Sequence, residues 1–408
     1  MQKELLFLPG PVTVAEPVLA AMSRPLIDHR GRAFAELLAR IVRRLQPIFG
    51  TRGEPVLLGA SGTGGLEAAV TSLFKPGETL LATPVGVFGR RLAGIARTYG
   101  CEVEILDTAW GHALDPATLA NRLRADTERK IGGILLTHNE TSTGVQNDLA
   151  ALAAITASHP AMTVVDSVSG LGASPFEMDD WKFDVVVSAS QKVFAAPPGV
   201  AMVAASERAW AKMESGEPSN FSLSLLKARE FARQGQTPWT PPISVFFALD
   251  AALERYEREG AKNVAWRHEC YARAIRAAFV ALHMKLYSQG LAHSPTVVAA
   301  LVPEAVDAGA LLRNLRDVRG VVLSGGQQEL KGKIVRMGTM GDVSQTDVLG
   351  ALGALEIALL EMDVPVKVGS GVQAALRIFL DMDAAMLTPG GPQNNDARTD
   401  GQTTVTSP

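Results

Sequence analysis

Between about residues 55 and 205, short runs of β-branched and leucine residues alternate with longer stretches of helical character, and this alternation constrains the fold more than any other feature of the chain. Such a pattern is typical of a mostly parallel sheet covered by helices. The chain is therefore predicted to be an α/β protein with ligands bound beyond the carboxyl ends of its strands. Seven strands are expected, at residues 55–59, 79–83, 102–106, 133–137, 163–166, 184–188 and 200–204.

The length of 408 residues exceeds the size at which one core keeps growing, so two unequal domains are expected. Long helices over residues 244–286 and two strands, at 296–301 and 334–337, predict a smaller α/β domain in the C-terminal part. The predicted units are an N-terminal arm (1–20), a large domain (21–255), a small domain (256–385) and a disordered tail (386–408).

The segment from about residue 206 to residue 242 is interrupted by glycine and proline. It contains Gly216, Pro218, Gly235 and Pro238, and it ends in two further prolines. This composition predicts a long, irregular functional loop rather than a linker.

The composition excludes several classes of protein. The formal net charge is −3 and no lysine and arginine block stands out, so neither a nucleic-acid nor a membrane partner is expected. Two cysteines cannot form a disulfide framework, no histidine or cysteine spacing matches a metal site, and no apolar run is long enough to cross a bilayer. A cytoplasmic protein without a metal is predicted.

A strand expected at residues 55–59 runs into the small-residue turn Ser61-Gly62-Thr63-Gly64 and then into a helix. Glycines let backbone N–H groups approach an anion, and the helix N-terminus adds partial positive charge. The turn is therefore a candidate phosphate site, although it lacks the dinucleotide fingerprint and the P-loop lysine. An ordinary glycine-rich turn is the alternative reading.

Asp166 ends the strand expected at residues 163–166, where an unpaired charge would be costly. A protonated pyridinium nitrogen would be a suitable cationic partner, and an Asp in that role keeps the ring able to accept electrons. The alternative is an Asp that caps the following turn.

Lys192 follows another buried strand, at residues 184–188, through the small polar run Ser188-Ala189-Ser190-Gln191. Most lysines are solvated surface charges. A desolvated lysine has a lowered pKa, so it can condense with an aldehyde and later move a proton. The position after a buried strand favours this second reading.

Together with Pro9-Gly10-Pro11, Thr137-His138-Asn139-Glu140-Thr141 and Arg336-Met337-Gly338, these segments resemble the class V aminotransferases, enzymes of fold type I that use pyridoxal 5'-phosphate (PLP). The resemblance covers nearly the whole chain. It implies that Lys192 forms the Schiff base with PLP and that Asp166 pairs with the ring nitrogen. It also implies phosphate binding by Ser61, Gly62, Thr63 and Gln191, contacts to the ring from Thr141 and Val168, and substrate contacts from Arg336 and Gly10.

Three further assignments follow from the same resemblance. Phe88 stands where the family most often has a Trp or Tyr stacked on the cofactor ring. Thr237 and Thr240 lie in a proline-rich segment similar to one that crosses a dimer interface, which implies a homodimer. Arg336 is expected to bind the substrate α-carboxylate through a bidentate contact.

The implied reaction is transamination between a small amino acid, alanine or serine, and a small 2-oxo acid such as glyoxylate or pyruvate, in a ping-pong cycle through pyridoxamine phosphate. A PLP-dependent lyase of the cysteine-desulfurase kind is one alternative, but Cys101 and Cys270 are not expected on a loop near the cofactor. A pyridoxamine–pyruvate type aminotransferase is another, because the C-terminal half of the chain also resembles that enzyme in Arg267-His268, Val321-Val322 and the Arg336 strand. The phosphate-binding turn argues against this alternative. A non-catalytic PLP-binding relative is the third.

Overall fold

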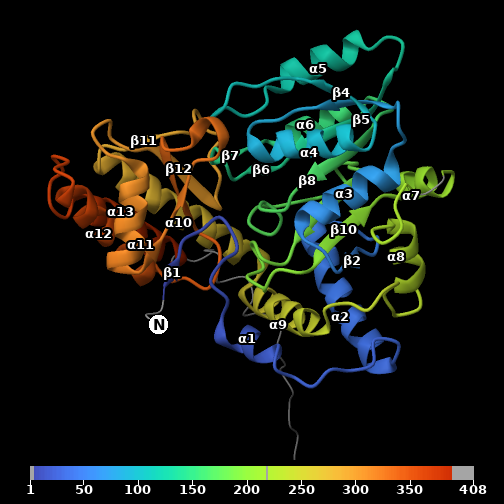
Figure 1. Ribbon diagram of the computed structural model, residues 1–408, viewed down its shortest axis with the longest axis horizontal. Coiled ribbons are helices and arrows are strands. Elements are labelled where there is room, and N and C mark those ends of the chain that lie inside the picture. Colours follow the sequence, from blue (N-terminus) through green and yellow to red (C-terminus); the bar gives the residue numbers. More distant parts are fainter. Residues whose placement is uncertain (1–3, 217–218, 388–408) are drawn as a thin grey trace, which may run out of the picture.

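A seven-stranded sheet forms the centre of the larger part of the molecule in the computed structural model, which describes residues 4–216 and 219–387 (Figure 1). The strand order is β2-β10-β9-β8-β5-β3-β4; β10 runs antiparallel to both its neighbours, and the other pairs are parallel. The predicted α/β class and all seven predicted strands are confirmed. The strands are β2 (Val56–Leu58), β3 (Thr79–Ala82), β4 (Glu102–Ile105), β5 (Ile131–Thr137), β8 (Met162–Asp166), β9 (Val185–Ala189) and β10 (Ala201–Ala205).

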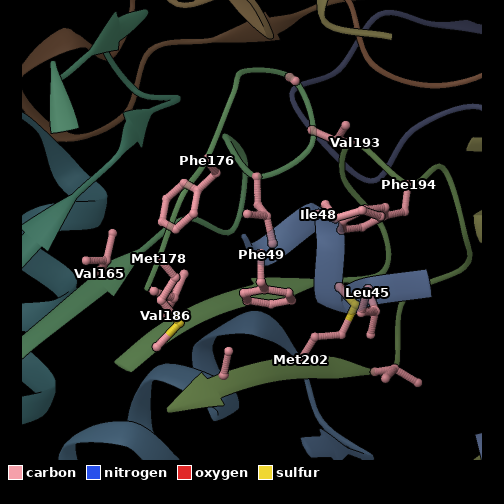
Figure 2. Close-up of a cluster of buried hydrophobic side chains, with 14 of the residues drawn as sticks. Leu45, Ile48, Phe49, Val165, Phe176, Met178, Val186, Val193, Phe194 and Met202 are labelled. Atoms are coloured by element: carbon pink, nitrogen blue, oxygen red, sulfur yellow. The ribbon is translucent and has the colours of Figure 1, made fainter. Parts of the chain in front are cut away.

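Helices cover both faces of this sheet because alternate strand residues point to opposite faces. One apolar cluster joins the sheet to α2 (Arg32–Phe49), α5 (Pro116–Ala125), α6 (Leu149–Thr156) and α9 (Ile243–Glu259). Figure 2 shows part of it, including Phe49 of α2, Val186 of β9 and Met202 of β10. The other face packs against α3 (Gly62–Leu73), α4 (Val87–Thr98), α7 (Glu207–Glu214) and α8 (Leu225–Ala232).

The prediction of an irregular loop over residues 206–242 is wrong, because α7 and α8 lie within that segment. Ser206 and Ser224 cap these helices by accepting hydrogen bonds from the amides of Ala209 and Lys227. Each helix has only eight residues and buries few apolar side chains, among them Trp210, so neither has a long periodic pattern in the sequence.

The smaller part of the molecule contains a four-stranded antiparallel sheet in the order β11-β12-β15-β14. Its strands are β11 (Lys285–Leu286), β12 (Val297–Leu301), β14 (Ser324–Gly325) and β15 (Ile334–Gly338), which confirms the two strands expected there. Its helices are α10 (Ala261–Ala281), α11 (Ala308–Arg319), the short 3-10 helix η1 (Gln328–Leu330), α12 (Gln345–Glu361) and α13 (Ser370–Leu387). Most of the predicted tail, residues 388–408, lies outside the described residues.

The N-terminal segment connects the two parts. Its first strand, β1 (Leu5–Leu6), lies beside the smaller part (Figure 1) and pairs in parallel with β13 (Val321–Val322). Phe7 is buried in the apolar core of the smaller part. The Gly338 amide donates to the Phe7 carbonyl at 2.7 Å. Beyond residue 10 the chain enters α1 (Glu16–Ala21), which packs against α9 of the larger part. The predicted domain limits themselves stay a prediction.

Two short strands, β6 (Asn139–Glu140) and β7 (Val145–Gln146), form a small hairpin after β5. This hairpin places residues 139–144 between the two parts of the molecule, since the Gly144 carbonyl accepts a hydrogen bond from the amide of Ser294, in the smaller part. Among residues 4–216 and 219–387, no helix is both long and apolar enough to cross a membrane.

Candidate active site

A cavity of about 240 Å³ opens beyond the carboxyl ends of β5, β8 and β9. Ten of the thirteen residues predicted from the sequence line it, and Thr237, Thr240 and Arg336 do not. The predicted residues that line it are Gly10, Ser61, Gly62, Thr63, Phe88, Thr141, Asp166, Val168, Gln191 and Lys192. Leu66, Arg91, Asn139 and Ser169 complete the wall.

One end of the cavity is the N-terminus of α3. Ser61 is the N-cap residue, and its hydroxyl accepts a hydrogen bond from the Gly64 amide at 3.2 Å. The amides of Gly62 and Thr63 lie in the first turn, where a helix has no internal acceptor for them. A Cβ at Gly62 would lie 3.0 Å from the methyl carbons of Val168, so a side chain there would have to displace its neighbours. These amides, with the positive end of the helix dipole, suit a phosphate group.

Arg91 of α4 adds a positive charge at this end and was not predicted from the sequence. Its guanidinium lies over the Phe88 ring at 4.6 Å from the centroid, and one of its nitrogens is 3.5 Å from the Thr63 hydroxyl. Within the described residues Arg91 forms no salt bridge, in contrast to its neighbour Arg90, which pairs with Glu329. The cavity therefore has an unpaired cation where a phosphate would carry its negative charge.

Asp166 ends β8 in the floor of the cavity and is 5% exposed. Its Oδ1 accepts a hydrogen bond from the Val168 amide at 3.0 Å. Burial raises the pKa of Asp166 to about 7, although Lys192 and Arg91 act to lower it. The described residues place no cation in contact with this carboxylate, so a protonated ring nitrogen would supply the partner that the ionised form needs.

Lys192 lies in the loop after β9, opposite the N-terminal segment. Its Nζ donates a hydrogen bond to the Pro9 carbonyl, and a Cβ at Gly10 would approach that Nζ to 2.7 Å. Burial lowers the pKa of Lys192 to about 8, with Asp166 opposing the change and Arg336 adding to it. The amine can thus be neutral near physiological pH, which nucleophilic attack on an aldehyde requires.

Two amide oxygens buried in the cavity wall have no hydrogen-bond partner among the described residues. They are Oε1 of Gln191, which was predicted, and Oδ1 of Asn139, which was not. The Asn139 amide nitrogen donates to the hydroxyls of Ser169 at 2.9 Å and Thr296 at 3.0 Å. Unpaired buried polar atoms are uncommon in folded proteins, so these two indicate a polar ligand in the cavity.

Arg336 lies on β15 behind the cavity and is 4% exposed. Its Nε donates to the Gly325 carbonyl at 2.9 Å and its Nη1 to the Thr141 carbonyl at 2.8 Å. Nη2 has no partner within the described chain, and burial lowers the pKa of the guanidinium to about 10. The side chain reaches the cavity wall through Thr141, and one edge remains free for an anion.

Thr237 and Thr240 do not line the cavity of their own chain. The Thr237 hydroxyl donates to the Trp239 carbonyl at 2.8 Å, and Thr240 is exposed. Their assignment to the phosphate of a second subunit stays a prediction.

His138 and the two cysteines are unsuited to catalysis. Burial lowers the pKa of His138 to about 4, and its Nδ1 is hydrogen-bonded to the Ser167 hydroxyl at 2.8 Å. Both cysteines are buried, and burial raises the pKa of the Cys270 thiol to about 12. No group of three or more potential metal ligands occurs in the described part of the chain. These observations disfavour the lyase alternative, which would need a reactive thiol at the cavity.

The family model "Aminotransferase class-V" matches residues 19–342. A soluble hydrogenase 42 kDa subunit from Anabaena cylindrica is 36% identical over 92% of this chain and 99% of its own length. An L-aspartate–glyoxylate aminotransferase from Paracoccus denitrificans is 34% identical over 93% and 97%. The crystal structure of the pyridoxamine–pyruvate aminotransferase from Mesorhizobium loti superposes with a TM-score of 0.89 at 31% identity, over 93% of this chain and 98% of that one.

The fold and the cavity define a PLP-dependent enzyme of fold type I, and the chain belongs to the class V aminotransferases. The resemblance inferred from the sequence motifs is confirmed. The observations that suit PLP are independent of the similarity: an anion site at α3, a buried carboxylate in need of a cation, and a desolvated lysine between them.

Proposed function

We propose that this enzyme transfers the amino group of a small amino acid, alanine or serine, to a small 2-oxo acid such as glyoxylate or pyruvate. The observation that carries the proposal is the pairing of Lys192, with its lowered pKa, and the buried Asp166 in one cavity beside an anion site. The names of two relatives point to the same acceptors, since one acts with glyoxylate and the other with pyruvate.

When bound, PLP supplies an electron sink for the charge that develops at the substrate α-carbon. Lys192 would hold the cofactor through Nζ, and its free amine would take up the substrate α-proton as a general base. Asp166 would hold the ring nitrogen in its protonated form. The free edge of Arg336 binds the substrate carboxylate and orients the α-carbon toward Nζ. Gly10 keeps the space beside Nζ open, since a side chain there would meet the lysine.

The reaction is tested by spectral titration. Purified holoenzyme is mixed with single amino acids, and then with single 2-oxo acids, while the visible absorbance of the cofactor is followed. Alanine or serine should convert the spectrum, and glyoxylate or pyruvate should restore it. A protein whose spectrum responds to no amino acid would be a non-catalytic relative, and the proposal would be abandoned.

The pKa of Lys192 gives the pH dependence of cofactor capture. With a pKa of about 8, about half of the amine is neutral at pH 8, whereas an ordinary lysine of pKa 10.5 would be about 0.3% neutral. The rate at which the apo protein captures PLP should therefore rise with pH up to about 8 and level off above it. Stopped-flow absorbance measures this rate; a rate still rising tenfold per unit at pH 9 to 10 would contradict the lowered pKa.

Arg91 is proposed to bind the phosphate together with the α3 turn. Because a hydrogen bond to a charged group is worth about 1.5 to 3 kcal/mol, Arg91→Gln should weaken PLP binding by at least about tenfold. Its affinity for pyridoxal, which has no phosphate, should not change. Arg90→Gln is the matched control, since Arg90 is one residue away and pairs with Glu329 outside the cavity.

Fluorescence titration of the apo variants gives both dissociation constants. If Arg91→Gln weakens the binding of PLP and of pyridoxal equally, Arg91 does not bind the phosphate. A wild-type protein that prefers the unphosphorylated ring would instead favour the pyridoxamine–pyruvate type of reaction.

We also propose a cytoplasmic homodimer, in which the segment with Thr237 and Thr240 reaches the phosphate of the second subunit. The exposed aromatic pair Phe221 and Trp239, with ring centroids 5.0 Å apart, supports an interface at this segment. Sedimentation equilibrium should give twice the chain mass, and Trp239→Asp should shift the protein toward the monomer and weaken PLP binding. A monomer that retains full PLP affinity would contradict the proposal; cell fractionation tests the location.

A further inference from the structure

Glu140 is a fully buried carboxylate that neither the predicted site nor the proposed mechanism uses. It lies in β6, between Asn139 and Thr141 of the cavity wall, and no cation forms a salt bridge with it in the described part of the chain. A buried charge needs hydrogen bonds to offset its desolvation. Each of its two oxygens accepts a pair of hydrogen bonds, and the two pairs come from different segments.

The first oxygen, Oε2, caps the N-terminus of α4. It accepts hydrogen bonds from the amides of Phe88 and Gly89, each at 3.0 Å. The helix has no N-cap side chain of its own, because its N-cap residue is Gly86. A Cβ at Gly86 would lie 2.5 Å from the Glu140 Cγ, so the helix terminus and the carboxylate are in close contact. Glu140 therefore fixes the turn of α4 that carries the Phe88 ring into the cavity.

The second oxygen, Oε1, holds the loop after β6. It accepts hydrogen bonds from the Ser142 amide at 3.0 Å and the Ser142 hydroxyl at 2.6 Å. That hydroxyl in turn accepts a hydrogen bond from the Val87 amide at 2.9 Å, which closes a ring of contacts back to α4. Thr141 lies between the two linked residues, and its carbonyl accepts the hydrogen bond from Arg336 Nη1.

We propose that Glu140 is a positioning residue that joins the cofactor-facing Phe88 and the substrate-facing Arg336 into one rigid unit. The inference rests on the proposed role of Arg336 as the carboxylate clamp. Burial raises the pKa of Glu140, whereas the hydrogen bonds from Ser142, Gly89 and Phe88 lower it and so favour the ionised form. The ionised carboxylate in turn raises the pKa of the Arg336 guanidinium and helps to keep it charged despite its burial. Removal of the carboxylate should therefore disturb cofactor orientation and substrate binding together.

Glu140→Gln keeps the shape but replaces one accepting oxygen by an N–H donor, which cannot accept from a backbone amide. With the holoenzyme, KM for L-alanine should rise about tenfold, and the circular dichroism of bound PLP in the visible range should change. Glu356→Gln is the matched control. Glu356 is likewise a buried carboxylate that accepts from two amides, those of Gly369 and Gly371, but it lies in the smaller part, outside the cavity wall.

A double-mutant cycle with Arg336→Lys separates positioning from general destabilisation. If Glu140 acts through Arg336, the double variant should have nearly the KM of Arg336→Lys alone. If the two substitutions raise KM independently, so that their factors multiply in the double variant, the inference is overturned. An unchanged dichroism of PLP in Glu140→Gln would overturn it as well. Arg336→Lys with an unchanged KM would instead show that the proposed clamp itself is wrong.

If Glu140→Gln does not fold, Gly86→Ala serves in its place. The added methyl group would push the carboxylate from the α4 side without changing its charge. The same changes in KM and dichroism are expected, and their absence in a folded Gly86→Ala would overturn the inference.

Discussion

Replacing Lys192 by alanine is expected to lower the transamination rate by at least about 10³-fold, since general-base catalysis alone contributes about 10² to 10⁴-fold and the covalent bond to the cofactor is lost as well. The substitution removes the Nζ that donates a hydrogen bond to the Pro9 carbonyl. It also removes the amine whose pKa is raised by the charge of Asp166. Single-turnover kinetics with L-alanine gives the rate, and borohydride reduction followed by mass spectrometry shows whether the chain still bonds PLP.

PLP should still bind to this variant without a covalent bond, because the anion site at α3 and Asp166 are unchanged. Lys262→Ala is the control, since Lys262 is an exposed lysine of α10 that does not line the cavity. Turnover of Lys192→Ala at the rate of the wild type would remove the central assignment.

The architecture could be predicted because most strands of the large sheet are short, largely apolar runs between polar or glycine-rich turns. β9, for example, is buried along its whole length. The helices α7 and α8 could not be predicted in the same way. They are short, they bury only part of one face, and the glycines and prolines around them dominate the composition of the segment.

The site residues that were predicted lie at the ends of strands, where a polar residue after an apolar run is conspicuous. Arg91, Asn139 and Glu140 were not predicted because their importance comes from contacts with distant segments. Asn139 contacts Thr296, and Glu140 contacts the amides of Phe88 and Gly89. A sequence read without spatial neighbours cannot show that an acidic residue caps a helix about fifty positions earlier.

The cavity shifts the pKa values of its two central groups, Asp166 and Lys192, in opposite directions. Burial raises the pKa of Asp166 and lowers that of Lys192, so it favours the neutral form of both groups. A protonated ring nitrogen would pair with the Asp166 carboxylate and so lower its pKa, which favours the ionised form. The cost of burying Asp166 in the apo protein thus becomes a source of cofactor affinity and of ring protonation.

Asp166→Asn should therefore lower kcat by about 10² to 10⁴-fold, because a broken buried ion pair costs about 3 to 5 kcal/mol and an amide cannot hold a positive ring nitrogen. The apo variant should at the same time be more stable than the apo wild type at pH 8. The folded-state pKa of Asp166, about 7, lies above the unfolded value, so the folded wild type binds more protons and loses stability as pH rises toward 7. Thermal unfolding at pH 5 and pH 8, with steady-state kinetics, measures both.

The matched control is Asp184→Asn. Asp184 is also buried, but it lies at the amino-terminal end of β9, whereas the cavity lies beyond the carboxyl ends of the strands. It forms a salt bridge with Arg208. Its substitution should remove the salt bridge with Arg208 and lower stability, while kcat stays near that of the wild type. Should Asp166→Asn behave like this control, with lower stability and nearly normal kcat, then Asp166 would be a structural residue, and the ring nitrogen would have to find its partner elsewhere. A carboxylate that destabilises the apo protein but pairs with the cofactor should behave differently from this control. Its substitution should lower the activity and raise the stability of the apo protein.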